Sequence, residues 1–393
     1  MSTERFVAKK ILDAPPSGIR KFFDIASEMK DAISLGVGEP DFVTPWNIRE
    51  MAIFSMERGY THYTSNHGNV GLRKLVAEYL DERYGLCYTP LEEIVITVGA
   101  SEALDLVFRA TIEEGDEVLV PAPSYVSYMP GVTFAGGVPV PIETREEDNF
   151  ILTEEQIEKA VTSKTKAIVI PYPNNPTGAI MTREQLKDIV RVVVKHDLLV
   201  ISDEIYSELT YGGSHTSIAS FEEIFPRCVV INGFSKAFAM TGFRLGYAAG
   251  PKPLIDAMVK IHQYSMLCAP TASQYAGEEA LKQEMASGFA QVGKMVRSYD
   301  MRRRFVYNGF RQMGLDCFEP KGAFYIFPCI QSSGMTSDEF CLKLLEKKKV
   351  ACVPGTAFGQ AGEGFMRCSY ASSMDNLKEA LKRIGEFLAE CRK

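Results

Sequence analysis

KAIVIPYPNNPTGAIMTREQLKDIVRVVVKHDLLVISDE, residues 166–204, holds two short apolar runs on either side of an amphipathic segment. The runs 166–172 and 198–204 are apolar at consecutive positions, as in strands that are covered on both faces. The segment 182–196 between them opens with the capping-box pattern T-x-x-Q, and its apolar positions recur at helical spacing. The stretch therefore predicts a strand, a helix and a second strand parallel to the first.

Similar apolar runs recur between residues 93 and 250, with amphipathic segments between them. Strands are expected at 93–98, 117–122, 166–172, 198–204, 227–233 and 245–250. Such alternation implies an α/β fold with a mainly parallel, doubly wound sheet. Ligands of these sheets bind at the carboxyl ends of the strands.

The sequence pattern changes after about residue 285. A long charged helical segment is followed by shorter apolar runs and two more helices, expected at 289–313, 322–328, 336–348, 350–355, 365–371 and 375–391. We therefore expect a large domain over 46–285 and a smaller α+β domain over 286–393. The arm and segment over 1–45 are expected to pack with the small domain. The motif SLGVGEP in this segment must reach the ligand site, at the carboxyl ends of the strands, from outside the main sheet.

The composition argues against several classes of function. Of the 393 residues, 46% are hydrophobic and 24% are charged, as in ordinary globular proteins. A net charge of −7 argues against nucleic acid as the main partner, because phosphate backbones attract basic surfaces. The nine cysteines and five histidines are dispersed, so reduced thiols and no metal site are expected. With no signal-peptide pattern and no long apolar run, we expect a cytoplasmic protein that does not span a membrane.

Three polar motifs directly follow predicted strands: PNNPTG (173–178), SDEIYSELTY (202–211) and NGFSKAFAMTGFRLGY (232–247). Considered singly, the first is either a tight turn or an Asn at a strand end that donates its side-chain amide to a ligand oxygen. Asp203 is either a helix N-cap or a carboxylate for a protonated ring nitrogen, with Tyr206 one helical turn away. Lys236 is either a surface lysine or a desolvated nucleophile. Each motif alone leaves both interpretations open.

Together, these motifs resemble the class I/II aminotransferases of fold type I, over nearly the whole chain (34–371). The resemblance implies pyridoxal 5′-phosphate as the cofactor, held as an aldimine by Lys236. The same lysine would move a proton between the substrate α-carbon and the cofactor. Asp203 would pair with the ring nitrogen, while Tyr206 and Asn175 would hydrogen-bond the phenolic oxygen.

The resemblance also implies how the rest of the cofactor is held. The segment VGASEAL would offer the backbone N–H groups of Ala100 and Ser101 to the phosphate at a helix N-terminus. Ser235 and Arg244 would add side-chain contacts to the phosphate, and Tyr125 would stack on the ring. Considered singly, these residues are an ordinary strand-to-helix turn, a surface arginine and a core tyrosine.

Substrate and subunit contacts follow from the same resemblance. Arg367 would hold the substrate α-carboxylate with two parallel hydrogen bonds, although alone it is an ordinary strand arginine. Gly38 would approach the same carboxylate through its backbone, and Asn175 would help to bind the substrate. Tyr63 would reach the phosphate of the neighbouring subunit, which implies a homodimer with shared active sites.

A carboxylate held by Arg367 is not free to leave, so transamination of an L-amino acid is favoured over decarboxylation. Ser101 stands where some similar aspartate aminotransferases carry a lysine. Aromatic candidates for lining the pocket are Phe22, Tyr60, Tyr63 and Tyr125. We therefore favour aromatic or broad specificity, with 2-oxoglutarate as acceptor. Alternatives are an aspartate or N-acetyl-diaminopimelate aminotransferase, a Cys–S β-lyase of the same fold, and a non-catalytic pyridoxal-phosphate-binding regulator.

Overall fold

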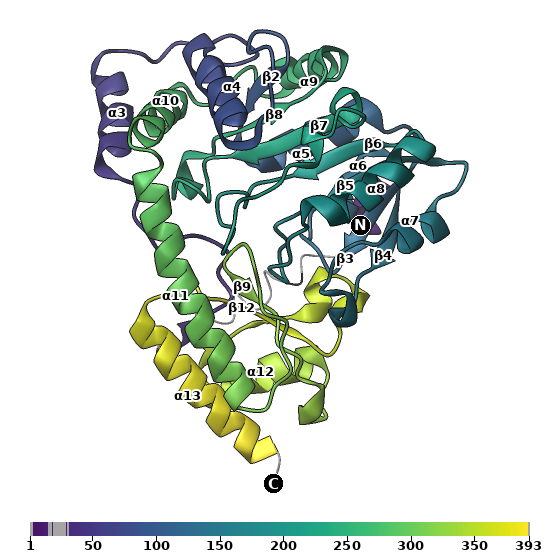
Figure 1. The fold of residues 1–393 in the computed structure, drawn as a ribbon, viewed down its shortest axis with the longest axis vertical. Helices are drawn as coiled ribbons and strands as arrows, with labels where there is room; N and C mark the ends of the chain where they lie inside the picture. Colours follow the sequence, from purple (N-terminus) through teal and green to yellow (C-terminus); the bar gives the residue numbers. More distant parts are fainter. Residues whose placement is uncertain (1–2, 15–17, 19–28, 30, 392–393) are drawn as a thin grey trace.

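A seven-stranded sheet forms the centre of the structure, a computed structural model that describes residues 3–14, 18, 29 and 31–391. Its order is β2-β8-β7-β6-β5-β3-β4 (Figure 1). The strands are β2 (Ile94–Thr97), β3 (Glu117–Ala122), β4 (Val138–Glu143), β5 (Thr165–Ile170), β6 (Leu199–Asp203), β7 (Cys228–Gly233) and β8 (Gly246–Ala249). Strands β3 to β7 pair in parallel, whereas β8 runs antiparallel to both of its neighbours.

The predicted α/β fold is confirmed, and all six predicted strands are present, with bounds that differ by at most two residues. The sequence pattern missed β4, whose sequence VPVPIE contains two prolines. Proline cannot donate to a strand ladder and is found mainly on edge strands. Because β4 lies at one edge of the sheet, its prolines are tolerated there.

Helices cover both faces of the sheet. One core unites strand side chains such as Ile94 and Ile96 with α4 (Val70–Tyr84), α7 (Glu154–Ala160), α8 (Arg183–Lys195) and α10 (Thr271–Ala286). The opposite core unites alternate side chains such as Val95 with α5 (Gly99–Thr111), α6 (Tyr128–Ala135) and α9 (Lys252–Ser265). The predicted capping box of α8 is present. The Thr182 hydroxyl accepts a hydrogen bond from the Gln185 backbone N–H, and the Gln185 side-chain oxygen accepts one from the Thr182 backbone N–H. Burial of both faces explains why the strands are apolar at consecutive positions.

A third core lies in the C-terminal part of the chain. It is built on α11 (Ala290–Gln312), α12 (Ser337–Lys348) and α13 (Met374–Cys391), together with β9 (Tyr325–Ile326), β10 (Val350–Ala351), β11 (Val353–Pro354) and β12 (Met366–Ser369). Helix α11 runs from the level of α10 down beside α13 (Figure 1). Strand β1 (Ile33–Ser34) pairs in parallel with β10, so these two residues lie against the C-terminal part of the chain.

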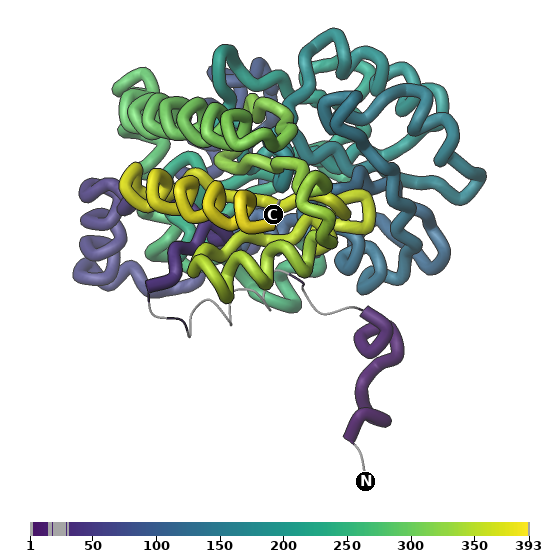
Figure 2. The backbone as a smooth tube through the Cα atoms, turned by 90° about the horizontal axis from the view of Figure 1, so that it is seen from below, coloured from purple at the N-terminus to yellow at the C-terminus, as the bar shows by residue number. Residues whose placement is uncertain are grey.

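Helices α1 (Lys9–Leu12) and α3 (Trp46–Glu57) lie nearer the N-terminus. The segment with α1 stands out from the body of the molecule (Figure 2). Lys10 Nζ in this segment donates to the Phe134 carbonyl at 2.6 Å. Among the described residues, no helix is both long and apolar enough to cross a membrane.

Candidate active site

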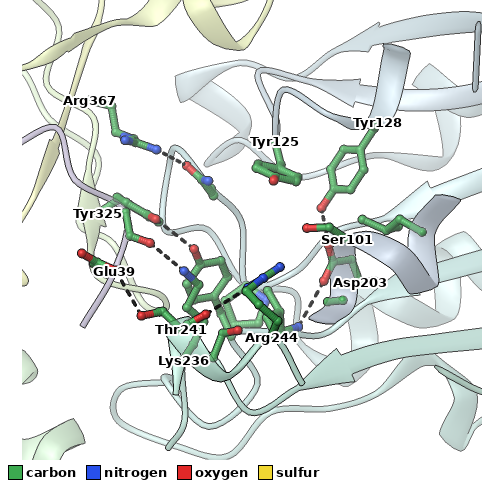
Figure 3. A pocket seen from close by; sticks show the side chains of 18 of the residues that line it. Glu39, Ser101, Tyr125, Tyr128, Asp203, Lys236, Thr241, Arg244, Tyr325 and Arg367 are labelled. Carbon is green, nitrogen blue, oxygen red and sulfur yellow. Dashed lines mark hydrogen bonds between the residues drawn. The ribbon is translucent and has the colours of Figure 1, made fainter. Parts of the chain in front are cut away.

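One cavity brings together nearly all of the predicted site residues. It has a volume of about 500 Å³. The predicted residues that line it are Gly38, Ala100, Ser101, Tyr125, Asn175, Asp203, Tyr206, Ser235, Lys236, Arg244 and Arg367 (Figure 3). Tyr63 does not line this cavity, and its side chain is among the most exposed apolar groups, at 80%. Phe22 lies outside the described residues.

The doubly wound sheet explains why these residues meet. Asp203 is the last residue of β6, and Lys236 follows the end of β7. Asn175 follows β5, and Tyr125 follows β3. The carboxyl ends of parallel strands share one edge of a sheet, so the side chains gather there although they are far apart in sequence. Arg367, in β12, faces them from the C-terminal part of the chain (Figure 3).

Lys236 is largely removed from water. Its Nζ donates to the Gly38 carbonyl at 2.6 Å and lies 5.8 Å from the ring centres of Tyr206 and Phe324. Burial lowers the pKa of Lys236 from 10.5 to about 8, partly opposed by the nearby carboxylate of Glu39. The cavity therefore holds an amine with an appreciable neutral fraction near pH 8.

Asp203 is a buried carboxylate held by two donors. The Tyr128 hydroxyl donates to Oδ2 at 2.7 Å, and the Ile205 N–H donates to Oδ1 at 3.2 Å. Burial raises the pKa of Asp203 to about 6, and the Tyr128 hydrogen bond is the largest opposing influence. The sequence interpretation missed Tyr128, although it lies three residues after Tyr125 in the motif PAPSYVSY.

The expected helical turn from Asp203 to Tyr206 is wrong. Residues 205–208 form hydrogen-bonded turns instead of a helix. The Ser207 N–H donates to the Glu204 carbonyl at 2.9 Å, which is the i to i+3 bond of a turn. Asp203 and Tyr206 nevertheless line the same cavity.

Arg367 is a buried cation with no carboxylate partner in the part of the chain that the structure describes. It is 2% exposed, and its guanidinium lies between the rings of Tyr325 and Phe358, at 4.5 and 4.8 Å. Its Nη atoms donate to Asn175 Oδ1 at 2.9 Å and to the Gly36 carbonyl at 2.5 Å. Its buried Nε has no hydrogen-bond partner within the described residues. A buried cation with a spare donor is suited to bind an anion.

A second group of donors suited to an anion lies at the start of α5. Ala100 and Ser101 are in the first turn of this helix, where backbone N–H groups are free to bind an anion. Arg244 approaches so closely that a Cβ at Gly99 would lie 2.6 Å from its Nη2. Ser235 lines the same cavity.

Tyr325 was missed by the sequence interpretation, although it lies in the quoted run GAFYIFP. Its hydroxyl is 2.9 Å from that of Tyr206, and a side chain at Gly38 would place Cβ 2.7 Å from the same oxygen. The absence of a side chain at Gly38 therefore leaves room for the Tyr325 hydroxyl. Sequence spacing carried no signal for this contact, because Tyr206 and Tyr325 come from different parts of the fold.

The fold and the site define a member of a known enzyme family: the chain belongs to the class I and II aminotransferases, whose family model matches residues 30–384. The putative aminotransferase YugH of Bacillus subtilis is 51% identical over 98% of both chains. An aspartate aminotransferase of Pyrococcus abyssi is 47% identical over 95% of this chain and 96% of its own. An aromatic-amino-acid aminotransferase of Thermococcus litoralis is 44% identical over the same shares.

Solved structures agree with this assignment. The aromatic aminotransferase of Pyrococcus horikoshii superposes with a TM-score of 0.90 at 44% identity, covering 95% of this chain and 99% of that one. The aspartate aminotransferase of Thermus thermophilus with maleate gives a TM-score of 0.92 at 39% identity, covering 97% and 99%. The predicted class of enzyme and its fold type are therefore confirmed.

Proposed function

We propose that this aminotransferase uses pyridoxal 5′-phosphate, held by Lys236, to exchange an amino group between an L-amino acid and a 2-oxo acid. One observation carries the proposal. A single cavity unites a buried amine, a buried carboxylate and two arginines, Arg244 and Arg367, neither of which has a carboxylate partner among the described residues. Such a site suits a ligand with two anionic groups, an electrophilic carbon and a basic ring nitrogen.

The donor set fits the cofactor part by part. The N-terminus of α5, Arg244 and Ser235 suit its phosphate. Asp203 suits the protonated ring nitrogen, because a buried carboxylate without a cation in contact gains from a positive partner. Tyr125, Tyr206 and Asn175 line the same cavity. Tyr125 would cover a ring face, and Tyr206 with Asn175 would bind the phenolic oxygen.

When bound, pyridoxal phosphate supplies an electron sink for the bond broken at the substrate α-carbon. The protein must then move one proton. With its pKa near 8, the Lys236 amine is able to accept a proton from the substrate α-carbon and then to donate it to the cofactor. Asp203 keeps a proton on the ring nitrogen and so maintains the ring as an electron acceptor.

The base and the carboxylate site are joined by one short segment. Lys236 binds the Gly38 carbonyl, and Arg367 binds the Gly36 carbonyl. A substrate carboxylate on Arg367 is thus held close to the lysine that acts at the neighbouring carbon. This grip also keeps the carboxylate from leaving, which favours transamination over decarboxylation.

For the substrate, we propose an aromatic or broad range of amino donors with 2-oxoglutarate as acceptor. Tyr325 lines the cavity beside Arg367, with the guanidinium 4.5 Å from its ring centre, which supports a preference for flat or apolar side chains. Ser101 offers no positive charge to a distal carboxylate. The similarity to enzymes named for aspartate keeps an aspartate aminotransferase as the second candidate.

We further propose a cytoplasmic homodimer in which Tyr63 completes the phosphate site of the partner. Large exposed side chains support a contact surface: Val43, Trp46, Met56, Tyr63 and Tyr264 are 74, 58, 55, 80 and 86% exposed. The segment with Tyr63 adjoins residue 271, because the Thr271 hydroxyl donates to the His62 carbonyl at 2.8 Å. Within each subunit we propose the division 1–45, 46–285 and 286–393, with α11 extending from the first core to the third.

Absorbance spectroscopy of the purified protein tests the function. The protein should carry a pH-dependent pyridoxal phosphate band that disappears when a good amino donor is added and returns with 2-oxoglutarate. A panel of phenylalanine, tyrosine, aspartate and N-acetyl-diaminopimelate ranks the donors, while thiol release from a cysteine thioether reports β-lyase activity. If reconstituted protein holds no pyridoxal phosphate, or no donor changes the band, the proposal is wrong.

A further inference from the structure

The hydrogen bond from Tyr128 to Asp203 has no part in the roles described so far. Tyr128 is the first residue of α6 and is 3% exposed. Its hydroxyl points at Asp203 from the side of the cavity opposite Arg367 (Figure 3). Burial raises the pKa of this phenol well above its ordinary value, so Tyr128 donates a proton to the bond and does not ionise.

We infer that Tyr128 is a positioning residue that stabilises the ionised carboxylate of Asp203 and thereby keeps their shared proton on the cofactor ring nitrogen. The inference rests on the proposed function, because it requires a pyridine ring opposite Asp203. A hydrogen bond donated to a carboxylate stabilises its charged form and makes it a weaker base. Without that donor, Asp203 takes a larger share of the proton, and the ring loses part of its positive charge.

Few groups near Asp203 stabilise its ionised form. Burial is the largest influence on the carboxyl and favours its neutral form, and the charge of Glu204 acts in the same direction. The opposing groups are the Tyr128 hydroxyl, the Ile205 N–H and the charge of Lys236. Lys236 is proposed to be joined to the cofactor, so its charge is not counted on to stabilise the Asp203 carboxylate. Tyr128 is therefore the side chain that opposes the effect of burial.

Tyr128 is also held firmly in place. Its ring meets that of Tyr125 edge-on, with centroids 5.5 Å apart and planes at 79°. Both tyrosines come from the motif PAPSYVSY, at the turn that leads from β3 into α6. One turn thus supplies a residue for the ring face and the partner of Asp203.

The test uses the full-length enzyme reconstituted with pyridoxal phosphate that carries ¹⁵N in its ring, since the ¹⁵N chemical shift reports protonation of that nitrogen. Tyr128→Phe keeps the ring and removes the donor. This substitution should raise the ratio of unprotonated to protonated ring nitrogen by about tenfold, which is the scale of one hydrogen bond to a charged group. Incorporation of 3,5-difluorotyrosine at position 128, a stronger donor, should move the titration the opposite way and keeps the test decisive if Tyr128→Phe does not fold.

Two comparisons separate this role from a structural one. In an Asp203→Asn background, Tyr128→Phe should leave the ¹⁵N shift unchanged, because its effect passes through the carboxylate. Tyr172→Phe is the matched control, since Tyr172 is equally buried and its hydroxyl bonds to the Phe150 carbonyl and the Leu152 N–H. It should leave the shift unchanged in the presence of Asp203.

The outcomes distinguish the two proposals. If the unaltered protein takes up no pyridoxal phosphate, the proposed function fails and this inference fails with it. If it does take up the cofactor but changes at residue 128 leave the ¹⁵N titration where it was, the inference alone is overturned. An equal effect of Tyr128→Phe with and without Asp203 would also overturn it.

Discussion

At the scale of single residues, burial moves the pKa values of Lys236 and Asp203 toward each other. The amine falls from 10.5 to about 8, and the carboxyl rises from 3.8 to about 6. Both charged forms lose hydration in the cavity, and without a ligand neither regains it fully. Groups prepared for chemistry in this way lower the stability of the empty fold.

Asp203→Asn should therefore stabilise the cofactor-free protein at pH 8. The folded pKa of Asp203 lies above its unfolded value, so its ionisation costs stability as the pH rises from about 4 to about 6. Two pKa units correspond to about 3 kcal/mol, fully present above pH 6 and absent below pH 4. Urea unfolding at pH 8, 6 and 5 measures the gain, which should shrink in that order. A gain that is independent of pH would contradict the burial argument.

Arg367→Ala should raise KM for α-amino acids by about a hundredfold, the scale of a lost charge-assisted pair of hydrogen bonds. Steady-state kinetics should be compared for an amino acid and for the amine of the same side chain without a carboxylate. The amine should be little affected. Equal losses for both would show that Arg367 does not bind the α-carboxylate.

At the scale of elements, the position of α5 depends on close packing against β8. A side chain at Gly246 would place Cβ 2.5 Å from the Ala100 nitrogen, and Gly99 adopts φ of +77°. The first turn of α5 therefore lies almost in contact with the backbone of β8. The proposed anion site at Ala100 and Ser101 depends on this packing.

Gly246→Ala should displace the start of α5 and weaken pyridoxal phosphate binding by at least about tenfold, since phosphate contacts depend on sub-ångström placement. Fluorescence titration of the cofactor-free protein measures the affinity. Gly213→Ala is the control, because a Cβ there meets nothing within 4 Å. Unchanged affinity in Gly246→Ala would place the phosphate elsewhere.

The sequence predicted elements better than side-chain contacts. Apolar runs located six strands, but VPVPIE did not indicate β4, and periodicity does not reveal that β8 runs antiparallel. The resemblance selected residues that the structure brings into one cavity. Tyr128 and Tyr325 were missed, because the hydroxyl contacts that place them there depend on the packing of distant segments.

At the scale of the whole molecule, the site is proposed to need two chains. Tyr63 lies outside the cavity of its own chain, and its side chain is 80% exposed. In a symmetric dimer, each site would combine Lys236 of one chain with Tyr63 of the other.

Mixing inactive Lys236→Ala with impaired Tyr63→Ala should therefore restore activity. In a mixed dimer one site carries both changes and the other carries neither, so a random mixture should recover about a quarter of full activity. Turnover after co-refolding measures the recovery, with each variant alone as control. Activity no greater than the sum of the two would contradict a shared site.

Lys236 is proposed to carry the cofactor. Borohydride reduction of the native protein, followed by proteolysis and mass spectrometry, tests this proposal directly. The peptide that contains Lys236 should bear the mass of a reduced pyridoxal phosphate adduct, and Lys236→Ala should bear none. An adduct on any other lysine, or an unmodified Lys236 in protein that contains the cofactor, would contradict the claim.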